Sequence, residues 1–415
     1  QARPFLLRND MEIMKKFALS SLAVAVTLVT QSAHAAVKLD PQAINLEPFR
    51  LVPVLGFQVL MDDNIYNFSA NEVDSMILVV SPSVNLAAQD RDNTYTLSYG
   101  INAGFYSEES DNDYIDHALT ASAGLNVTSR AKLDLDASYS MLHEDLGTGA
   151  TQGVGLAGIA ALSGPDEYSL LGLKSALTYG AEGAAGQLVG SVGMSNKRYD
   201  RDVAAALRDL DTVDYGIGFR YRVAPKTKLT FDIERSEGSY RNSAVARTAD
   251  FEQTAFLVGA VWENSAQTTG RVRMGQTERE VASGFDKSGF TYSGDVTWSP
   301  RELTRFNFGL SKGFTDGTLP TISIEQTNYS VAWSQDWLER LTSTVSFGVL
   351  DEDHQMQVGS APREDQTETI GVRLDYQMRR WLVLGGGLTS KASDSTLNVY
   401  DVDRNIFFLS AQISL

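Results

Sequence analysis

Residues Phe219 to Glu234 read FRYRVAPKTKLTFDIE. On either side of a short turn at residues 224–226, apolar and polar side chains alternate one by one. Successive side chains of a β-strand point to opposite faces, so this period of two predicts a β-hairpin with one apolar and one charged face. In a soluble protein the apolar face would form the core. In a membrane barrel it would contact lipid, and the charged face would line a lumen.

The N-terminal region contains the three parts of a secretory signal peptide over residues 14–35. Two lysines precede an apolar run, and the segment ends in the small-x-small sequence Ala33-His34-Ala35. We therefore expect cleavage near Ala35. No later apolar run is long enough for a transmembrane helix.

Composition excludes several classes of protein. The chain has 415 residues and no cysteine, so neither disulfides nor thiolate metal sites are expected. The formal net charge of −17 argues against a nucleic-acid partner. The pattern of residue types does not change from Arg50 to Leu415, which favours one large β architecture over several domains.

Long alternating segments recur along this whole region, and short connections alternate with longer, more acidic ones. The strands are expected near residues 50–61, 73–88, 94–106, 114–128, 132–142, 167–180, 187–199, 211–223, 227–239, 250–262, 267–280, 287–298, 303–313, 322–335, 340–350, 365–378, 381–391 and 402–415. Their length suits a tilted crossing of a bilayer, and an even number with unequal connections is typical of outer-membrane barrels.

The fold class predicted is all-β: a single transmembrane antiparallel up-and-down β-barrel of about 18 strands (16–18), with short periplasmic turns and longer extracellular loops. The expected segments are upstream non-structural residues 1–13, a signal peptide over 14–35, a periplasmic N-terminal segment over 36–49 and an outer-membrane barrel over 50–415.

The final segment, RNIFFLSAQISL, alternates to the terminal residue and resembles the C-terminal signal read by the barrel-assembly machinery. Many such signals end in Phe, whereas this one ends in Leu415. Outer-membrane lipid and lipopolysaccharide are the further partners expected of a barrel in the bacterial outer membrane.

The face opposite the apolar one would line the lumen. Its charged candidates are Arg220, Arg222, Lys228, Asp232, Glu234, Arg271, Arg273, Asp295, Arg305, Arg373 and Asp375. A basic wall could guide an anionic solute, because Arg forks match carboxylate and phosphate. Alternatively, the basic residues pair with Asp232, Glu234 and Asp295 across strands and only make the barrel rigid.

Two loops have unusual sequences. Residues Gly147 to Gly164 are apolar for an exposed loop, so this loop is a lumen constriction, a disordered tip or a partner contact. Residues Asp202 to Leu210 read as one or two helical turns with Asp202 as the N-cap.

The sequence shows no recognisable catalytic arrangement of residues. His117, His143 and His354 lie at loop or strand ends without metal spacing, and no Ser/His/Asp arrangement is legible. The acidic clusters at Asp62-Asp63-Asn64 and Asp111-Asn112-Asp113 lack a complete calcium-loop pattern and are expected to be solvated loops. We expect no enzyme, no cofactor, no catalytic residue and no bound metal.

Residues 53–67, PVLGFQVLMDDNIYN, resemble the first strand and loop of porin-like outer-membrane barrels found beside exopolysaccharide and capsule biosynthesis genes. Residues 95–125 resemble the next hairpin of that family, with a Tyr-rich strand and an Asp-Tyr-x-Asp-His loop. The resemblance is clear over residues 50–140 and is limited to the general residue pattern afterwards.

The resemblance implies a conduit for secretion of an exopolysaccharide or capsular polysaccharide. Its partners would be the polysaccharide and a periplasmic or inner-membrane export apparatus. Two alternatives stay open from the sequence: a general or sugar-uptake porin, and a structural or adhesive surface barrel with a closed lumen.

Overall fold

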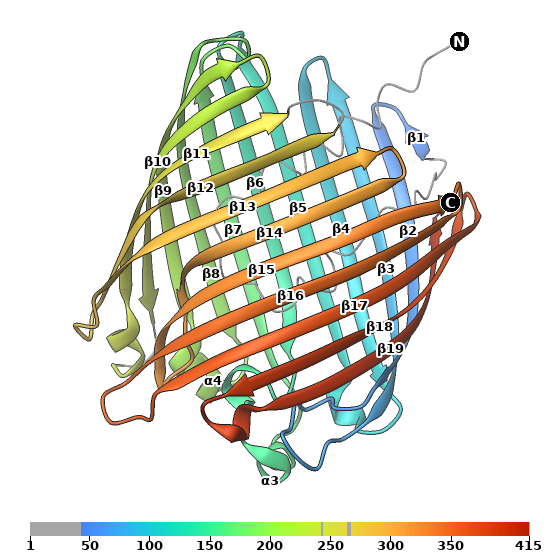
Figure 1. The fold of residues 1–415 in the computed structure, drawn as a ribbon, viewed down its shortest axis with the longest axis vertical. Helices are drawn as coiled ribbons and strands as arrows, with labels where there is room; N and C mark the ends of the chain where they lie inside the picture. Colours follow the sequence, from blue (N-terminus) through green and yellow to red (C-terminus); the bar gives the residue numbers. More distant parts are fainter. Residues whose placement is uncertain (1–42, 242–243, 264–266, 415) are drawn as a thin grey trace.

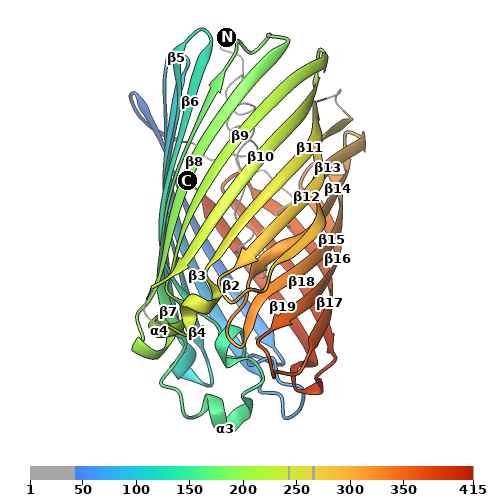
Figure 2. The same ribbon diagram turned by 90° about the vertical axis from the view of Figure 1, so that its left-hand side faces the viewer.

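The computed structural model describes residues 43–241, 244–263 and 267–414. It is almost entirely β-structure, and eighteen antiparallel strands form one closed barrel (Figures 1 and 2). A nineteenth strand, β1 (Ile44–Leu46), adds a short pairing to the edge of β2. The barrel strands are β2 (Phe49–Asp62), β3 (Ser75–Asp90), β4 (Asn93–Tyr106), β5 (Tyr114–Thr128), β6 (Ala131–Glu144), β7 (Asp166–Tyr179), β8 (Gly186–Tyr199), β9 (Leu210–Ala224), β10 (Thr227–Tyr240), β11 (Phe251–Glu263), β12 (Thr268–Val281), β13 (Lys287–Arg301), β14 (Thr304–Asp316), β15 (Thr321–Leu338), β16 (Leu341–Met356), β17 (Arg363–Arg379), β18 (Leu382–Ser395) and β19 (Val402–Ser414).

The barrel closes where its first strand meets its last. β19 pairs with β2 from Asp62↔Ile406 to Val54↔Ser414, and every other neighbour in the sheet follows sequence order. Closure matters because a bilayer offers no water to an unpaired backbone group, so a β-sheet can span lipid only without edges. The predicted fold class is confirmed, including all eighteen strands.

The two ends of the barrel differ, as the sequence predicted. One end has short turns, such as residues 225–226 between β9 and β10, and the end of β19 lies there. The long connections lie at the other end and include the helices α3 (Gly155–Ile159) and α4 (Asp202–Arg208) (Figure 1). Short 3-10 turns also lie in these connections: η1 (Ser110–Asn112), η2 (Gly149–Thr151), η3 (Ala246–Ala249) and η4 (Asn398–Tyr400). In the described part of the chain, no helix is both long and apolar enough to cross a membrane.

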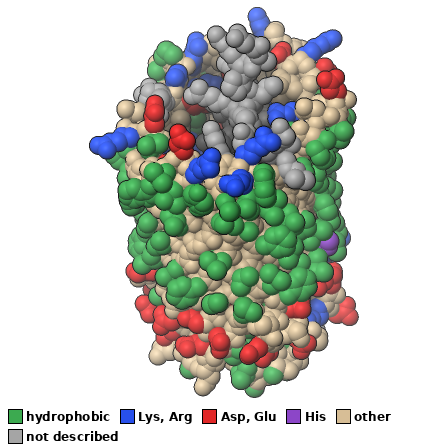
Figure 3. Space-filling view, turned by 90° about the vertical axis from the view of Figure 1, so that its right-hand side faces the viewer, with side chains coloured by type: hydrophobic (Ala, Val, Ile, Leu, Met, Phe, Trp, Pro, Cys, Tyr) green, Lys and Arg blue, Asp and Glu red, His purple; other side chains and the backbone are tan. Residues whose placement is uncertain are grey.

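An apolar belt surrounds the outside of the barrel. In the hairpin of β9 and β10, the apolar side chains on one face are 39–51% exposed: Phe219, Tyr221, Phe231 and Ile233. Arg220, on the other face, is partly buried. Figure 3 shows the belt on one face, with mostly acidic side chains at its edge toward the long loops and both basic and acidic ones toward the turns. A large apolar surface that is continuous around a molecule marks contact with lipid. The apolar face therefore points outward, as the membrane interpretation required.

Two of the expectations are wrong, and a third concerns residues that the structure does not describe. Residues 351–356 were expected in a loop, but β16 continues through them to Met356. Acidic residues are tolerated on both faces there because the strand has left the lipid belt. The N-cap of α4 is Arg201 rather than Asp202, and no side chain caps it. The predicted signal peptide lies outside the described residues.

A buried ion pair joins the two strands of the closing seam. Arg404 of β19 contacts both carboxylate oxygens of Asp62 of β2, whose side chain is only 1% exposed. Removing one partner leaves the other charge buried and unpaired, so we expect Asp62→Ala to lower the free energy of unfolding by about 3–5 kcal/mol. Urea unfolding of the barrel in lipid vesicles measures this.

Two variants control that measurement. Asp62→Ala combined with Arg404→Leu removes both charges and should recover much of the loss. Arg235→Ala, which breaks an exposed pair network with Glu237 and Glu252 on the outer surface, should unfold like the wild type. Equal losses for the single and double variants would contradict a role for the seam pair.

Candidate functional site

The inner face of the barrel carries all the predicted lumen residues. Strand pairing sets this, since residues opposite each other point to the same side: Phe219 pairs with Phe231 outside, and Arg220 with Thr230 inside. The same alternation places on the inner face Arg220, Arg222, Lys228, Asp232, Glu234, Arg271, Arg273, Asp295, Arg305, Arg373 and Asp375. That they line the path of a solute stays a prediction.

Water reaches some of these inward charges. The side chain of Asp295 is 69% exposed although it lies on the inner face, and that of its partner Arg271 is 25% exposed. A barrel of 16–18 strands is wide enough to hold an aqueous channel. Hydrated charges avoid most of the desolvation cost of a dry core.

Several of the basic residues are paired with acids. Arg271 contacts its cross-strand partner Asp295 at 3.1 Å, and Arg273 reaches over β11 to Glu234 at 2.6 Å. Arg373 contacts Asp375, two residues away on the same face, at 2.7 Å. Lys228 donates to Gln187 at 2.9 Å.

Three predicted lumen cations behave differently. Within the described ranges, no ion pair is formed by Arg220, Arg222 or Arg305. Arg271, Arg273 and Arg373 are therefore tied to acidic neighbours within the wall. That a basic wall guides an anionic solute stays a prediction.

The opposite part of the wall is neutral. The inner faces of β3 and β4, both fully described, carry hydroxyl and amide groups but no charged side chain. Ser98 donates to Asn85 at 2.7 Å, and Ser81 donates to Asn102 at 2.9 Å. The lumen thus combines charged side chains on β9, β10, β12–β14 and β17 with a hydroxyl- and amide-rich arc over β3 and β4.

The first long loop (residues 63–74) folds inward over the mouth at the long-loop end. Its Ile65, Tyr66 and Phe68 are 3–6% exposed and pack against Ile77 and Val79, which face the inside of β3. Each fully buried apolar side chain of this size contributes about 1.5–3 kcal/mol, which offsets part of the entropy cost of ordering the loop. Burial raises the pKa of the Tyr66 hydroxyl, so this group stays protonated and donates to Glu109 at 3.1 Å.

The third long loop (residues 145–165) packs on the first. Leu146 and Ile159 complete the same buried cluster, and Ile159 belongs to α3. Gly147 has φ +81°, and a Cβ there would lie 1.7 Å from the carbonyl oxygen of Tyr66. Only glycine allows the two loops to approach so closely.

The third long loop also crosses the mouth of the barrel. Gln152 accepts a hydrogen bond at 2.9 Å from Arg363 of β17, which is separated from β6 by six strands around the wall. Arg363 lies 3.5 Å from the ring centre of Tyr400 in η4. On the near side, Arg208 of α4 binds Glu144 and Asp166 at the base of the loop. Of the three alternatives for residues 147–164, the structure favours a constriction.

The acidic clusters that looked like solvated loops have structural roles. Asp62 closes the barrel seam, and the side chain of Asn64, fully buried, donates to the carbonyl oxygens of Phe68 and Asp403 at 2.8 Å. In the second cluster, Asn112 donates to the hydroxyl of Tyr66 at 2.8 Å. These residues fix the first long loop and the seam.

Sequence reasoning missed several side chains at the mouth, including Arg363, Arg208 and the group Glu352, His354 and Asp365. Their partners come from loops and from distant strands, which strand periodicity does not pair. One local signal was present: Glu352 and His354 are two residues apart, so in a strand they share a face.

A closed barrel with an apolar belt, an aqueous polar interior and an inward-folded loop defines an outer-membrane porin-like channel. The chain matches the family model described as "Putative beta-barrel porin 2" over residues 39–415, and it belongs to that family. No curated protein matches it.

Several solved structures are similar to this chain at low sequence identity. OccAB3 of Acinetobacter baumannii is 10% identical, with 89% of this chain and 100% of that chain covered and a TM-score of 0.49. OccK2 (OpdF) of Pseudomonas aeruginosa is 11% identical, with 88% and 98% covered and a TM-score of 0.48. The siderophore receptor PirA of Acinetobacter baumannii is 7% identical, with 90% and 81% covered and a TM-score of 0.44.

The packing of the two loops yields a prediction about conductance. Ile159→Asp puts a charge into the buried cluster, which undocks the third long loop because the unpaired carboxylate cannot stay buried. We expect the single-channel conductance in planar bilayers to roughly double as the constriction opens.

The matched control is Val358→Asp, the same kind of change at a side chain that is 97% exposed. It should conduct like the wild type. If Ile159→Asp and Val358→Asp have the same conductance as the unmodified barrel, the third long loop does not limit the channel.

Proposed function

We propose that this outer-membrane channel admits small hydrophilic solutes, such as short sugars and their acidic derivatives, into the periplasm. The observation that carries this proposal is the third long loop, held across the mouth by Gln152 and Arg363 and by its buried cluster with the first long loop. A small solute can pass beside a fixed constriction, whereas a thick polymer would have to displace it.

The chemistry of the wall supports the same class of solute. Hydroxyl and amide groups on β3 and β4 can exchange hydrogen bonds with sugar hydroxyls as the solute sheds water. Arg220, Arg222 and Arg305 can add bidentate contacts to a carboxylate or phosphate group. The paired charges elsewhere keep the lumen polar without a strong preference for one sign.

A conduit for exopolysaccharide or capsular polysaccharide is the second candidate. Its support is the resemblance of residues 53–67, but Asp62, Asn64 and Tyr66 of that stretch are buried and hold the first long loop and the seam. The sequence of residues 53–67 is therefore explained by the structure of the barrel mouth as well as by a transported polymer. The polysaccharide, an export apparatus and the barrel-assembly machinery stay predicted partners.

The swelling of proteoliposomes in sugars of increasing size tests the proposal. We expect rapid swelling in monosaccharides and disaccharides and a sharp fall for larger oligosaccharides, because the constriction sets a size limit. In Ile159→Asp liposomes the limit should move to larger sugars, which ties the cut-off to the third long loop.

Two results would contradict the proposal in different ways. Barrels that are folded but give neither swelling nor conductance steps would favour a closed surface barrel. A deletion strain that traps polymer in the periplasm, with sugar uptake unchanged, would favour the export conduit.

A further inference from the structure

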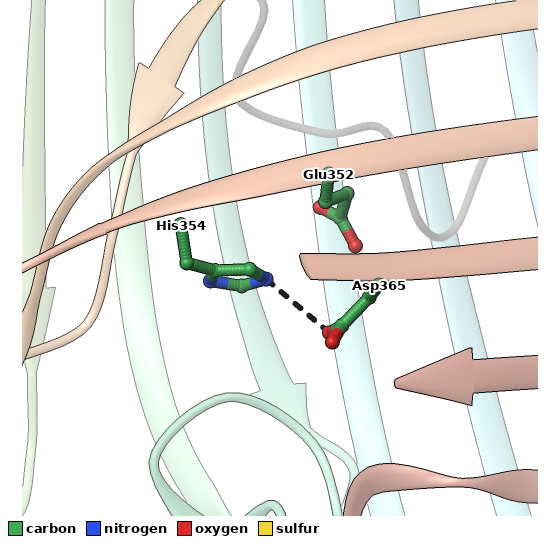
Figure 4. Close-up of side chains that lie close together, drawn as sticks. All are labelled: Glu352, His354 and Asp365. Atoms are coloured by element: carbon green, nitrogen blue, oxygen red, sulfur yellow. Dashed lines mark ion pairs between the residues drawn. The ribbon is translucent and has the colours of Figure 1, made fainter. Parts of the chain in front are cut away.

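Two carboxylates and an imidazole converge on the inner face near the barrel mouth. Glu352 of β16 and Asp365 of β17 are direct cross-strand partners, and His354 lies on the same face of β16 (Figure 4). One donor atom from each side chain lies within 4.8 Å of the other two. Like charges directly opposite each other on a sheet repel, so this arrangement favours a cation between them.

His354 is buried, and its hydrogen-bonding capacity is not fully used. The residue is only 9% exposed. Its ring points toward Asp365, and Nε2 forms an ion pair with Oδ2 at 3.2 Å (Figure 4), while Nδ1 has no hydrogen-bond partner among the described residues. A buried imidazole nitrogen that faces a carboxylate oxygen in this way suits shared coordination of a metal better than a shared proton.

We propose that Glu352, His354 and Asp365 bind a divalent transition-metal ion, for which Zn²⁺ is the reference. Tetrahedral ligands with bonds of about 2.0–2.1 Å lie about 3.3–3.4 Å apart, close to the His354–Asp365 separation. Glu352 needs only a small side-chain movement to join them. An imidazole with carboxylates favours Zn²⁺, Cu²⁺ or Ni²⁺ over Mg²⁺ and Ca²⁺, which prefer oxygen alone.

The surroundings of the site set its affinity. Gln326 donates to Oε1 of Glu352 at 2.7 Å and orients that carboxylate. Two neighbouring cations oppose the metal: Arg363 donates its Nε to both oxygens of Asp365 at 2.9–3.0 Å, and the charge of Lys391 on β18 acts on both carboxylates. Metal and Arg363 therefore compete for Asp365.

That competition links the site to the constriction. Arg363 is the residue that donates to Gln152 of the third long loop and lies on Tyr400. The proposal does not depend on which solute the channel carries, since the ligands are in the wall rather than on the path of a named substrate.

The test is titration of Zn²⁺ into the full barrel, refolded in detergent and purified without a His tag. Calorimetry should give one site per chain, and Co²⁺ should give the visible spectrum of a protein-bound ion. We expect His354→Ala to weaken binding by about 100-fold and Glu352→Gln by about 10-fold. Arg363→Gln should instead tighten binding by about 10-fold, since it frees Asp365.

His117→Ala is the matched control, because His117 lies on the outer face beside Tyr99 and should leave binding unchanged. Resistance of each variant to dissolved SDS at room temperature verifies that the barrel is folded. If His354→Ala fails to fold, Glu352→Gln decides the matter. No stoichiometric binding, equal affinity in the wild type and the folded ligand variants, or weaker binding in Arg363→Gln would overturn the proposal.

Discussion

Every feature of this molecule depends on the need to pair backbone hydrogen bonds where no water is present. A sheet in lipid can meet that need only by closing on itself, and here β19 returns to β2 with nine registered pairs. The buried contact of Arg404 with Asp62 joins the strands at that seam, and Asn64 ties the first long loop to the same place. Closure, loop anchoring and the sequence around Asp62 are therefore parts of one structure.

Closure also fixes what each face must be. The lipid requires apolar side chains outside, and strand alternation then gives the inside to the remaining polar residues. Because these residues meet water, acids and bases can lie together as they do at Arg273 and Glu234, without the full cost of burial. The functional consequence is a polar lumen whose width at one end is set by loops rather than by the strands.

The sequence predicts the strands, their faces and the difference in connection length between the two ends, because these are local properties of the chain. The contacts between loops at the mouth could not be predicted. The docking of Ile159 on Tyr66 and the reach of Gln152 to Arg363 join segments far apart in the chain. Residues 351–356 look like a loop by composition, so the shared face of Glu352 and His354 became visible only once β16 was seen to continue through them.

The apolar faces of the strands contact lipid, and their charged faces contact water inside the barrel. Because the chain has no cysteine, single cysteines can test this arrangement directly in liposomes with a small charged thiol reagent. We predict that cysteines at Arg220 and Asp232 react, while those at Phe219 and Phe231 are protected. Protection of the first pair and reaction of the second would contradict this arrangement.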